Sequence, residues 1–251
     1  MIKLIPAPHE EKFNNTAADY LLRDGCSHLG LEFPQEVEAR VNDYARGSIS
    51  YDELKTFLID GEIISPYFEQ GFRPILEILP VLYRRDKSFS VQCFEKLDIY
   101  NDWVFSRDEL ALAMLVNEDF ATLADLYEDL VKETRRRNEA IAERVGTFAE
   151  SLSSLHILVG RLHAPYVADR LSEKFDVKVI ILEDICLTPL DESIILRLKG
   201  FNFSSEELAV FLHRHREFAR EAEKEGKGIT DLLRDSEMEK RFRLKRYSDL
   251  A

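Results

Sequence analysis

The sequence predicts an α/β protein with a mainly parallel central sheet flanked by helices. Five short apolar runs are each followed by a segment with helical spacing, which is the alternation that builds parallel sheets. The run from Leu155 to Val159 is apolar except for His156, as is typical of a strand that is covered on both faces. A similar plan near the start of the chain indicates two related halves of one sheet.

The two similar segments each contain an apolar run, a histidine, a helical segment, a second apolar run and an acid. In the first segment Glu32 follows His9 by 23 residues, and in the second Glu183 follows His163 by 20 residues. We interpret the segments as two βα half-repeats within one sheet. The alternative, which the sequence leaves open, is that two unrelated strand–helix units each carry a histidine by coincidence.

Apolar runs and helical spacing together place the elements. The predicted strands lie near residues 2–6, 28–33, 89–94, 155–160 and 177–182. Helices are predicted over residues 13–23, 34–45, 51–59, 72–83, 106–116, 118–152, 164–175, 190–198, 204–224 and 229–233. Residues 61–70 are predicted to be irregular, and the charged tail from Glu237 is predicted to be a solvated helix.

Particular residues support these helix boundaries. Ser50 and Ser204 each precede a glutamate by three residues, which is the capping-box pattern. Pro165 falls in the first turn of its helix, where a missing N–H costs nothing. Pro74 and Pro80 predict either a kinked helix or two short helices over residues 72–83. Residues 118–152 form either one long helix or a broken pair.

We expect a single α/β domain that spans residues 1–251. Its first half-repeat covers about residues 1–98, and a helical insertion covers about residues 100–152. The second half-repeat covers about residues 153–200, and a helical C-terminal extension covers about residues 201–251. With 45% hydrophobic residues, a chain of this length can bury a sizeable core.

The net charge restricts the classes of partner. It is formally −13, with 34 basic against 47 acidic residues, which argues against nucleic acid or an anionic membrane as the main partner. No apolar run approaches the ~18 residues of a membrane span, and the N-terminus lacks the features of a signal peptide. We therefore expect a cytoplasmic protein. The sequence leaves open whether it forms a homo-oligomer.

Cysteine and methionine usage adds two further expectations. The three cysteines are widely spaced and lack CxxC spacing, so neither a disulfide framework nor a thiolate metal site is predicted. Three methionines and three cysteines beside 32% charged residues are a compositional hint of a thermophilic source.

Polar residues at the ends of the predicted strands are the candidate site residues. In open α/β sheets the ligand crevice lies outside the carboxyl ends of the strands, where His163 and the acids Glu183 and Asp184 fall. Glu95 and Asp98 follow another strand in the same way. We expect the crevice histidines to face solvent, so that alanine substitutions leave the melting temperature nearly unchanged.

The apolar stripe of the long helix is interrupted by polar residues just before the central strand. Asn138 lies in the stripe itself, and Arg137 borders it between Leu130 and Ile141. Buried polar groups need partners, and a crevice at the strand ends would supply them. The alternative is a helix whose polar face turns inward at its middle.

These motifs resemble those of the superfamily that groups erythromycin esterases, ChaN-like haem or iron proteins, and TraB proteins of the GumN and TIKI type. The resemblance covers roughly residues 1–185. Its motifs are the helix Arg137-Asn138-Glu139-Ala140-Ile141-Ala142, the second GxxH motif Gly160-Arg161-Leu162-His163, and the segment Leu29-Gly30-Leu31-Glu32-Phe33.

The first GxxH motif departs from the family pattern, because Pro6 stands at its glycine and Ala7 at its acidic position. Only His9 remains of that motif. The departure affects the expected esterase-type chemistry more than the expected fold.

The resemblance implies a crevice that contains His9, Glu32, Arg137 and His163. One chemistry open to this set is a divalent metal held by His9, Glu32 and His163, where Mn, Fe, Co or Zn would suit mixed N/O ligands and activate water. The other is direct general-base catalysis by a histidine that Glu32 orients, with Arg137 holding an oxyanion or substrate carboxylate. Both predict a hydrolase for a small-molecule or peptide substrate.

The sequence gives no support to other common enzyme classes, since it has no GxSxG elbow, P-loop or Rossmann glycine pattern. The remaining alternative is a non-catalytic binding protein of the TraB or ChaN type, which would hold haem, iron or a signalling ligand. Tyr100 or Tyr166 would then be the candidate haem ligands.

Overall fold

The computed structural model describes the chain except for residues 9, 62, 117 and 251 and the side chains of residues 66 and 67. Its contacts divide the chain into two compact units. The first, which we call the sheet unit, comprises Met1–Leu97 and Ala140–Leu182, and the second, the helical unit, comprises Asp98–Glu139 and Glu183–Ala251. Each unit is described by itself below, and the single domain predicted from the sequence stays a prediction.

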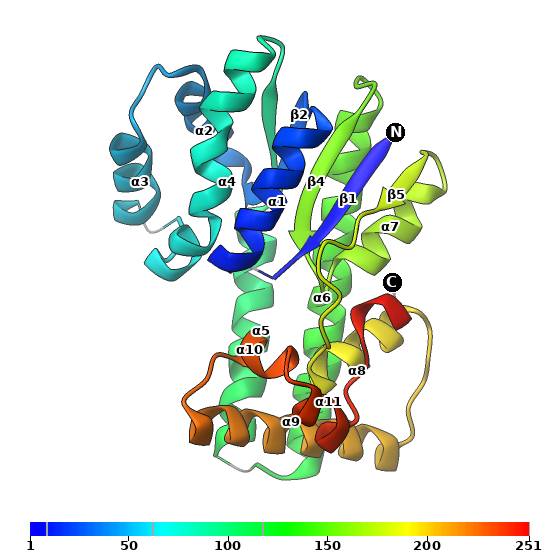
Figure 1. The fold of residues 1–251 in the computed structure, drawn as a ribbon. Helices are drawn as coiled ribbons and strands as arrows, with labels where there is room; N and C mark the ends of the chain where they lie inside the picture. The colour runs from blue at the N-terminus through cyan, green and yellow to red at the C-terminus, as the bar shows by residue number, and fades with distance from the viewer. Residues whose placement is uncertain (9, 62, 117, 251) are drawn as a thin grey trace. The chain divides into compact units, whose positions relative to one another are not determined.

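The sheet unit is built on a five-stranded parallel sheet, which confirms the predicted α/β fold class. Its strands are β1 (Ile2–Ala7), β2 (His28–Pro34), β3 (Ser90–Glu95), β4 (Leu155–Gly160) and β5 (Val177–Val179). They lie in the order β3-β2-β4-β1-β5, and every described pairing is parallel. Figure 1 shows β1 beside β4 although about 150 residues separate them in the sequence, as in the parallel sheets that long crossovers build.

The two strand–helix–strand segments share one kind of connection. The chain passes from β1 through α1 (Glu11–Asp24) to β2 and skips one strand, β4. It passes from β4 through α7 (Ala164–Ser172) to β5 and again skips one strand, β1. The two predicted half-repeats are therefore interleaved in the sheet, with β1 and β4 adjacent at its middle.

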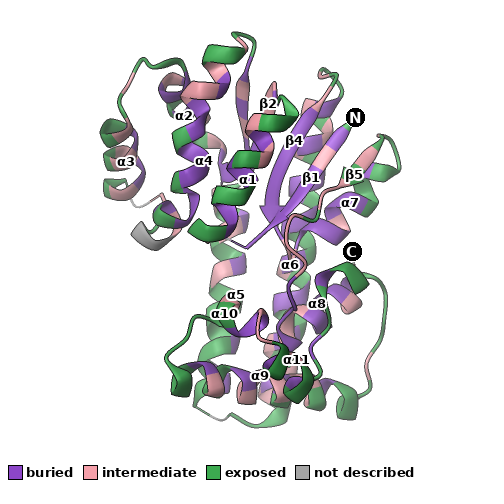
Figure 2. Ribbon diagram, viewed as in Figure 1, coloured by how far each residue is buried: buried purple, intermediate pink, exposed green. Residues whose placement is uncertain are grey.

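Helices enclose an apolar core around this sheet. Besides α1 and α7 they are η1 (Gln35–Val37), α2 (Glu38–Arg46), α3 (Tyr51–Asp60) and α4 (Pro66–Arg85). Every residue of β4 is buried (Figure 2), as its almost entirely apolar run predicted. The core includes Phe13, Leu21, Leu29, Phe33 and Phe72.

Helix α4 differs from its prediction. It begins at Pro66, where Ser65 accepts the N–H of Phe68 at 3.1 Å as an N-cap, so the second half of the segment predicted to be irregular, residues 66–70, is helical. Pro74 and Pro80 both lie inside this one helix. Burial of Phe72, Ile75 and Leu79 offsets the two hydrogen bonds that proline cannot donate.

Strand β3 lies at one edge of the sheet, and side chains from α2 cover this edge. Asn42 donates from Nδ2 to the carbonyl of Val91 at 2.8 Å and accepts the N–H of Val91 at Oδ1 at 2.9 Å. Glu38 accepts the N–H of Cys93 at 2.8 Å. Edge strands present unpaired backbone groups, and these two side chains satisfy three of them.

The Asn42→Ala variant is expected to lose about 2–4 kcal/mol of unfolding free energy, because two buried backbone groups of Val91 lose their partners. Urea unfolding followed by circular dichroism measures the loss. The matched control is Asn15→Ala, since Asn15 is exposed and donates to the carbonyl of Glu11 within its own helix. Equal stability losses in the two variants would contradict this account of the edge.

The helical unit holds most of the remaining helices. Among the described residues, α5 spans Leu97–Leu115, α6 Phe120–Ala149, α8 Pro189–Leu198, α9 Ser205–Glu225, α10 Ile229–Leu233, α11 Ser236–Phe242 and η2 Tyr247–Asp249. Helix α6 is one unbroken helix, and contacts assign it to the sheet unit from Ala140 onward. Helix α5 begins nine residues before the predicted Ser106, so Trp103 belongs to it.

The C-terminal tail is packed, and the prediction of a solvated helix is wrong. Met238 and Phe242 of α11 are buried against Phe218 of α9, whose ring meets that of Phe242 edge-on with centroids 5.5 Å apart. The prediction failed because only two apolar residues of this short helix form the buried stripe, and charged residues surround them in the sequence. The three cysteines are buried, and none forms a disulfide bond among the described residues. None of the described helices has an apolar stretch long enough to cross a bilayer.

Candidate functional site

Glu32 and His163 meet at the carboxyl ends of β2 and β4. Glu32 lies near the end of β2, and His163 follows β4 as the N-terminal flanking residue of α7. His163 Nε2 is 3.9 Å from Glu32 Oε1, which is longer than a direct hydrogen bond and within the range of an ion pair. The sheet thus brings together two of the four predicted site residues.

Gly160 and the turn that follows it build this arrangement. The N–H of Gly160 donates to Glu32 Oε2 at 2.7 Å and holds one oxygen of the carboxylate. The N–H of His163 donates to the carbonyl of Gly160 at 2.9 Å, which closes the turn that presents the imidazole. Two residues of the GxxH motif therefore lie against Glu32: Gly160 donates its backbone N–H to the carboxylate, and His163 places its imidazole beside it.

Both side chains are buried, so the expectation that the crevice histidines face solvent is wrong for His163. His163 is 3% exposed and Glu32 is 4% exposed. A buried carboxylate needs hydrogen bonds, and the amide of Gly160 supplies one of them. Removal of water strengthens the interaction of an imidazole with a carboxylate at this separation.

His9 lies outside the described residues, so the third predicted ligand is not placed. Glu32 and His163 offer one oxygen and one nitrogen, a mixture that suits Mn, Fe, Co or Zn. Two donors are fewer than such an ion takes from a protein. Within the described part of the chain, no three histidine, cysteine or acidic side chains lie close enough to hold a metal ion. The predicted metal site therefore stays a prediction.

Arg137 belongs to an aromatic cluster of the helical unit. Its guanidinium carbon lies 4.4 Å from the ring centroid of Trp103 and 5.1 Å from that of Tyr100. Trp103 donates from Nε1 to Thr134 Oγ1 at 3.0 Å. Arg137 is 3% exposed, so it is not a surface charge, and its place in the catalytic site stays a prediction.

Sequence reasoning missed this cluster because the predicted helix began only at Ser106. Tyr100 and Trp103 are three residues apart, the spacing that places two rings on one helix face. That signal could have been read from the sequence once α5 was extended to Leu97.

The other acids at the strand ends have different surroundings. Glu95 is buried at the end of β3, whereas Asp98 is exposed in the first turn of α5. Glu183 accepts two hydrogen bonds from Arg234, at 2.6 and 2.8 Å. Asp184 accepts the N–H and the hydroxyl of Ser248, at 2.9 and 2.8 Å. Glu183 and Asp184 therefore hold the C-terminal segment within the helical unit.

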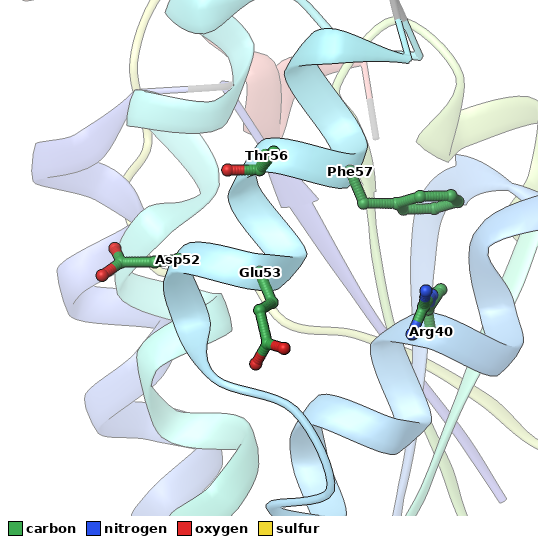
Figure 3. Close-up of a pocket in the computed structure, with 5 residues that line it drawn as sticks. All are labelled: Arg40, Asp52, Glu53, Thr56 and Phe57. Atoms are coloured by element: carbon green, nitrogen blue, oxygen red, sulfur yellow. The ribbon is translucent and has the colours of Figure 1, made fainter.

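A surface hollow of about 420 Å³ lies elsewhere, between α2 and α3 (Figure 3). Arg40 lies beneath the ring of Phe57, with its guanidinium carbon 5.5 Å from the ring centroid. Glu53, which also lines the hollow, completes the capping box of α3 by accepting the N–H of Ser50 at 2.7 Å. These side chains stabilise α3 and its packing, and none of them belongs to the predicted site.

A second histidine cluster lies towards the start of the strands. His156 Nε2 is 2.6 Å from Asp24 Oδ2, and Lys3 also bonds this oxygen. His156 is 2% exposed, and burial lowers its pKa, with partial compensation from Asp24. Burial alone would raise the pKa of Asp24, but the hydrogen bonds from Lys3 and His156 outweigh it and leave that pKa lowered.

These two shifts predict that stability falls as the pH falls. His156 and Asp24 both take up protons more readily in the unfolded chain than in the folded one. The free energy of unfolding therefore begins to fall near the ordinary histidine pKa of ~6.5, and it continues to fall below the ordinary aspartate pKa of ~3.9. The urea midpoint is expected to decrease between pH 7 and pH 5, and to decrease less in His156→Gln. His213→Asn, at an exposed histidine, is the control. An identical pH dependence in wild type and His156→Gln would contradict the prediction.

No protein-family model, curated protein or solved structure matches this chain.

Proposed function

We propose that the chain is a hydrolase in which His163 and Glu32 activate water. The observation that carries the proposal is the buried imidazole 3.9 Å from a carboxylate that the Gly160 amide holds in place. Fixed imidazole–carboxylate pairs serve in general acid–base catalysis, because the carboxylate orients the ring and stabilises the imidazolium that forms.

In the proposed reaction, the imidazole of His163 removes a proton from water as the water oxygen bonds to the electrophilic atom of the substrate. Glu32 stabilises the resulting imidazolium. The imidazolium then returns the proton to the leaving group as the scissile bond breaks. Arg137 is proposed to hold the oxyanion or a substrate carboxylate, on the basis of the family resemblance and its buried guanidinium.

A divalent metal is the second route to the same reaction. His9, Glu32 and His163 would hold it, and it would supply a bound water of lowered pKa. The substrate class is a small molecule or a peptide. The non-catalytic alternative, a haem or iron protein, gains no support from Tyr100, whose ring lies against Arg137.

The test is a panel of chromogenic carboxylic and phosphoric esters and of peptides, assayed on the purified protein. Each assay is run as purified, after chelation, and after addition of Mn²⁺, Fe²⁺, Co²⁺ or Zn²⁺. We expect turnover in wild type and in His213→Asn, and its loss in His163→Asn. Metal dependence would select the metal route, and activity that survives chelation would select direct base catalysis.

Two results would contradict the hydrolase proposal. One is turnover that His163→Asn leaves unchanged, because the activity would then come from another site or a contaminant. The other is no turnover together with a haem absorption band in the purified protein, which would favour the binding protein.

A further inference from the structure

The C-terminal part of helix α5 carries an exposed apolar face, which contains none of the proposed catalytic residues. Phe105, Leu112, Leu115 and Val116 are 63%, 60%, 72% and 58% exposed, and we call them the α5 face. Val116 directly follows α5, and its N–H still donates to the carbonyl of Leu112 at 3.0 Å. Leu112 and Val116 follow Phe105 by 7 and 11 residues, which places all three on one side of the helix.

This concentration of apolar side chains differs from the rest of the described surface. Other exposed large apolar residues, such as Phe201, Val210 and Ile229, stand singly along the chain. Single exposed apolar residues are normal in proteins, whereas neighbouring ones, such as Leu112, Leu115 and Val116, mark an interaction site. The α5 face is about 16 Å long at ~1.5 Å per helical residue, which matches about three turns of a partner helix.

Acidic side chains lie within and beside the face. Glu109 lies four residues after Phe105 and three before Leu112, and Glu118 follows Val116 by two residues. Both are exposed, and among the described residues neither forms an ion pair. Asp108 pairs with Arg107 at 2.8 Å, so Glu109 and Glu118 carry the net charge of the face.

We propose that the α5 face binds the apolar side of a basic amphipathic helix of a partner protein. Such a helix would place leucine-like side chains on Phe105, Leu112 and Leu115 and lysine or arginine beside Glu109 and Glu118. Apolar anchors at helical spacing with complementary charges at the edge are the basis of helix recognition on a protein surface. The small area predicts a transient complex.

The charges argue against the other occupants of such a face. A second copy would bring another Glu109 and Glu118 to the contact and would carry its own net charge of −13. An anionic membrane would be repelled by the same carboxylates. Only a basic partner gains from both the apolar side chains and the acids.

The probe is a fluorescein-labelled 18-residue synthetic helix with a leucine stripe and lysines on its other positions, titrated with the full chain and followed by anisotropy. A matched peptide with glutamate in place of lysine tests the charge. We expect the lysine peptide to bind and the glutamate peptide to bind at least 10-fold more weakly. The double variant Leu112→Ser/Leu115→Ser is expected to weaken binding at least 10-fold, and Glu109→Lys at least 3-fold.

The control variant is Val210→Ser, which removes an apolar side chain of similar exposure, 56%, on α9. It is expected to bind the peptide like wild type. No binding of the lysine peptide would overturn the proposal, as would equal binding by wild type and the double variant, since the attraction would then be general to the acidic protein. A wild-type dimer in sedimentation that the double variant dissociates would assign the face to a second copy. Attachment to phosphatidylglycerol vesicles that the double variant abolishes would assign it to a membrane.

Discussion

Hydrolysis by the His163→Asn variant is expected to be about 10²–10⁴-fold slower than by wild type, because this is the contribution of a positioned acid–base group. The assay is kcat on the best substrate of the panel. Asparagine is chosen because His163 is buried, and its amide preserves much of the volume and polarity that alanine would remove. Glu32→Gln is expected to reduce kcat as well, since the amide cannot stabilise an imidazolium.

Both variants must remain folded for this result to have meaning. In Glu32→Gln the substituted side chain would still offer a carbonyl oxygen to the N–H of Gly160, so this variant is expected to keep the hydrogen bond that orients the side chain. Circular dichroism and thermal melting check the fold of both variants. A folded His163→Asn protein with wild-type kcat would remove His163 from the mechanism.

The Arg137→Ala variant is expected to lose about 2–4 kcal/mol of unfolding free energy, because it removes a buried cation from two aromatic rings together with its apolar stem. Trp103, 4.4 Å from the guanidinium carbon, is the single tryptophan of the chain. Its fluorescence therefore reports this cluster, and its emission is expected to shift to longer wavelength as water reaches the ring. Arg137→Lys keeps the charge and loses the planar stacking, so a smaller shift is expected.

Arg135→Ala is the matched control, because Arg135 is exposed two residues before Arg137 on the same helix. Its tryptophan emission and stability are expected to equal those of wild type. If Arg137→Ala also keeps both, the stacking on Trp103 contributes nothing measurable. If Arg137→Lys lowers kcat while the emission is unchanged, Arg137 acts on the reaction and not only on the packing of α5.

The strands could be predicted closely from the sequence, and the helical unit less well. A buried parallel strand is a largely continuous apolar run, and that pattern is independent of what packs on it, so β1 to β4 lie within one residue of the predicted ranges. The strand predicted over residues 177–182 is shorter, because β5 ends at Val179. The lengths of α4 and α5 were underestimated because proline, glycine and charged residues interrupt their apolar periodicity. In α4, the burial of Phe72 and Leu79 stabilises the helix more than the two internal prolines destabilise it.

The candidate site could be predicted in part. Strand ends and the resemblance to known motifs pointed to Glu32 and His163, and the parallel pairing of β2 with β4 brings the two together. Their burial could not be read from position alone, because it depends on which elements cover the strand ends. The hydrogen bond from the Gly160 amide could not be predicted either, because its donor is a backbone N–H and no side chain in the sequence indicates it.

The central claim is that Glu32 and His163 act as one unit on water. Its most direct test is a double-variant cycle of kcat with wild type, Glu32→Gln, His163→Asn and the variant that carries both substitutions. Groups that act together give losses far from additive, so the double variant is expected to be no slower than the slower single variant. Losses that multiply would show that the two residues act independently and would contradict the claim.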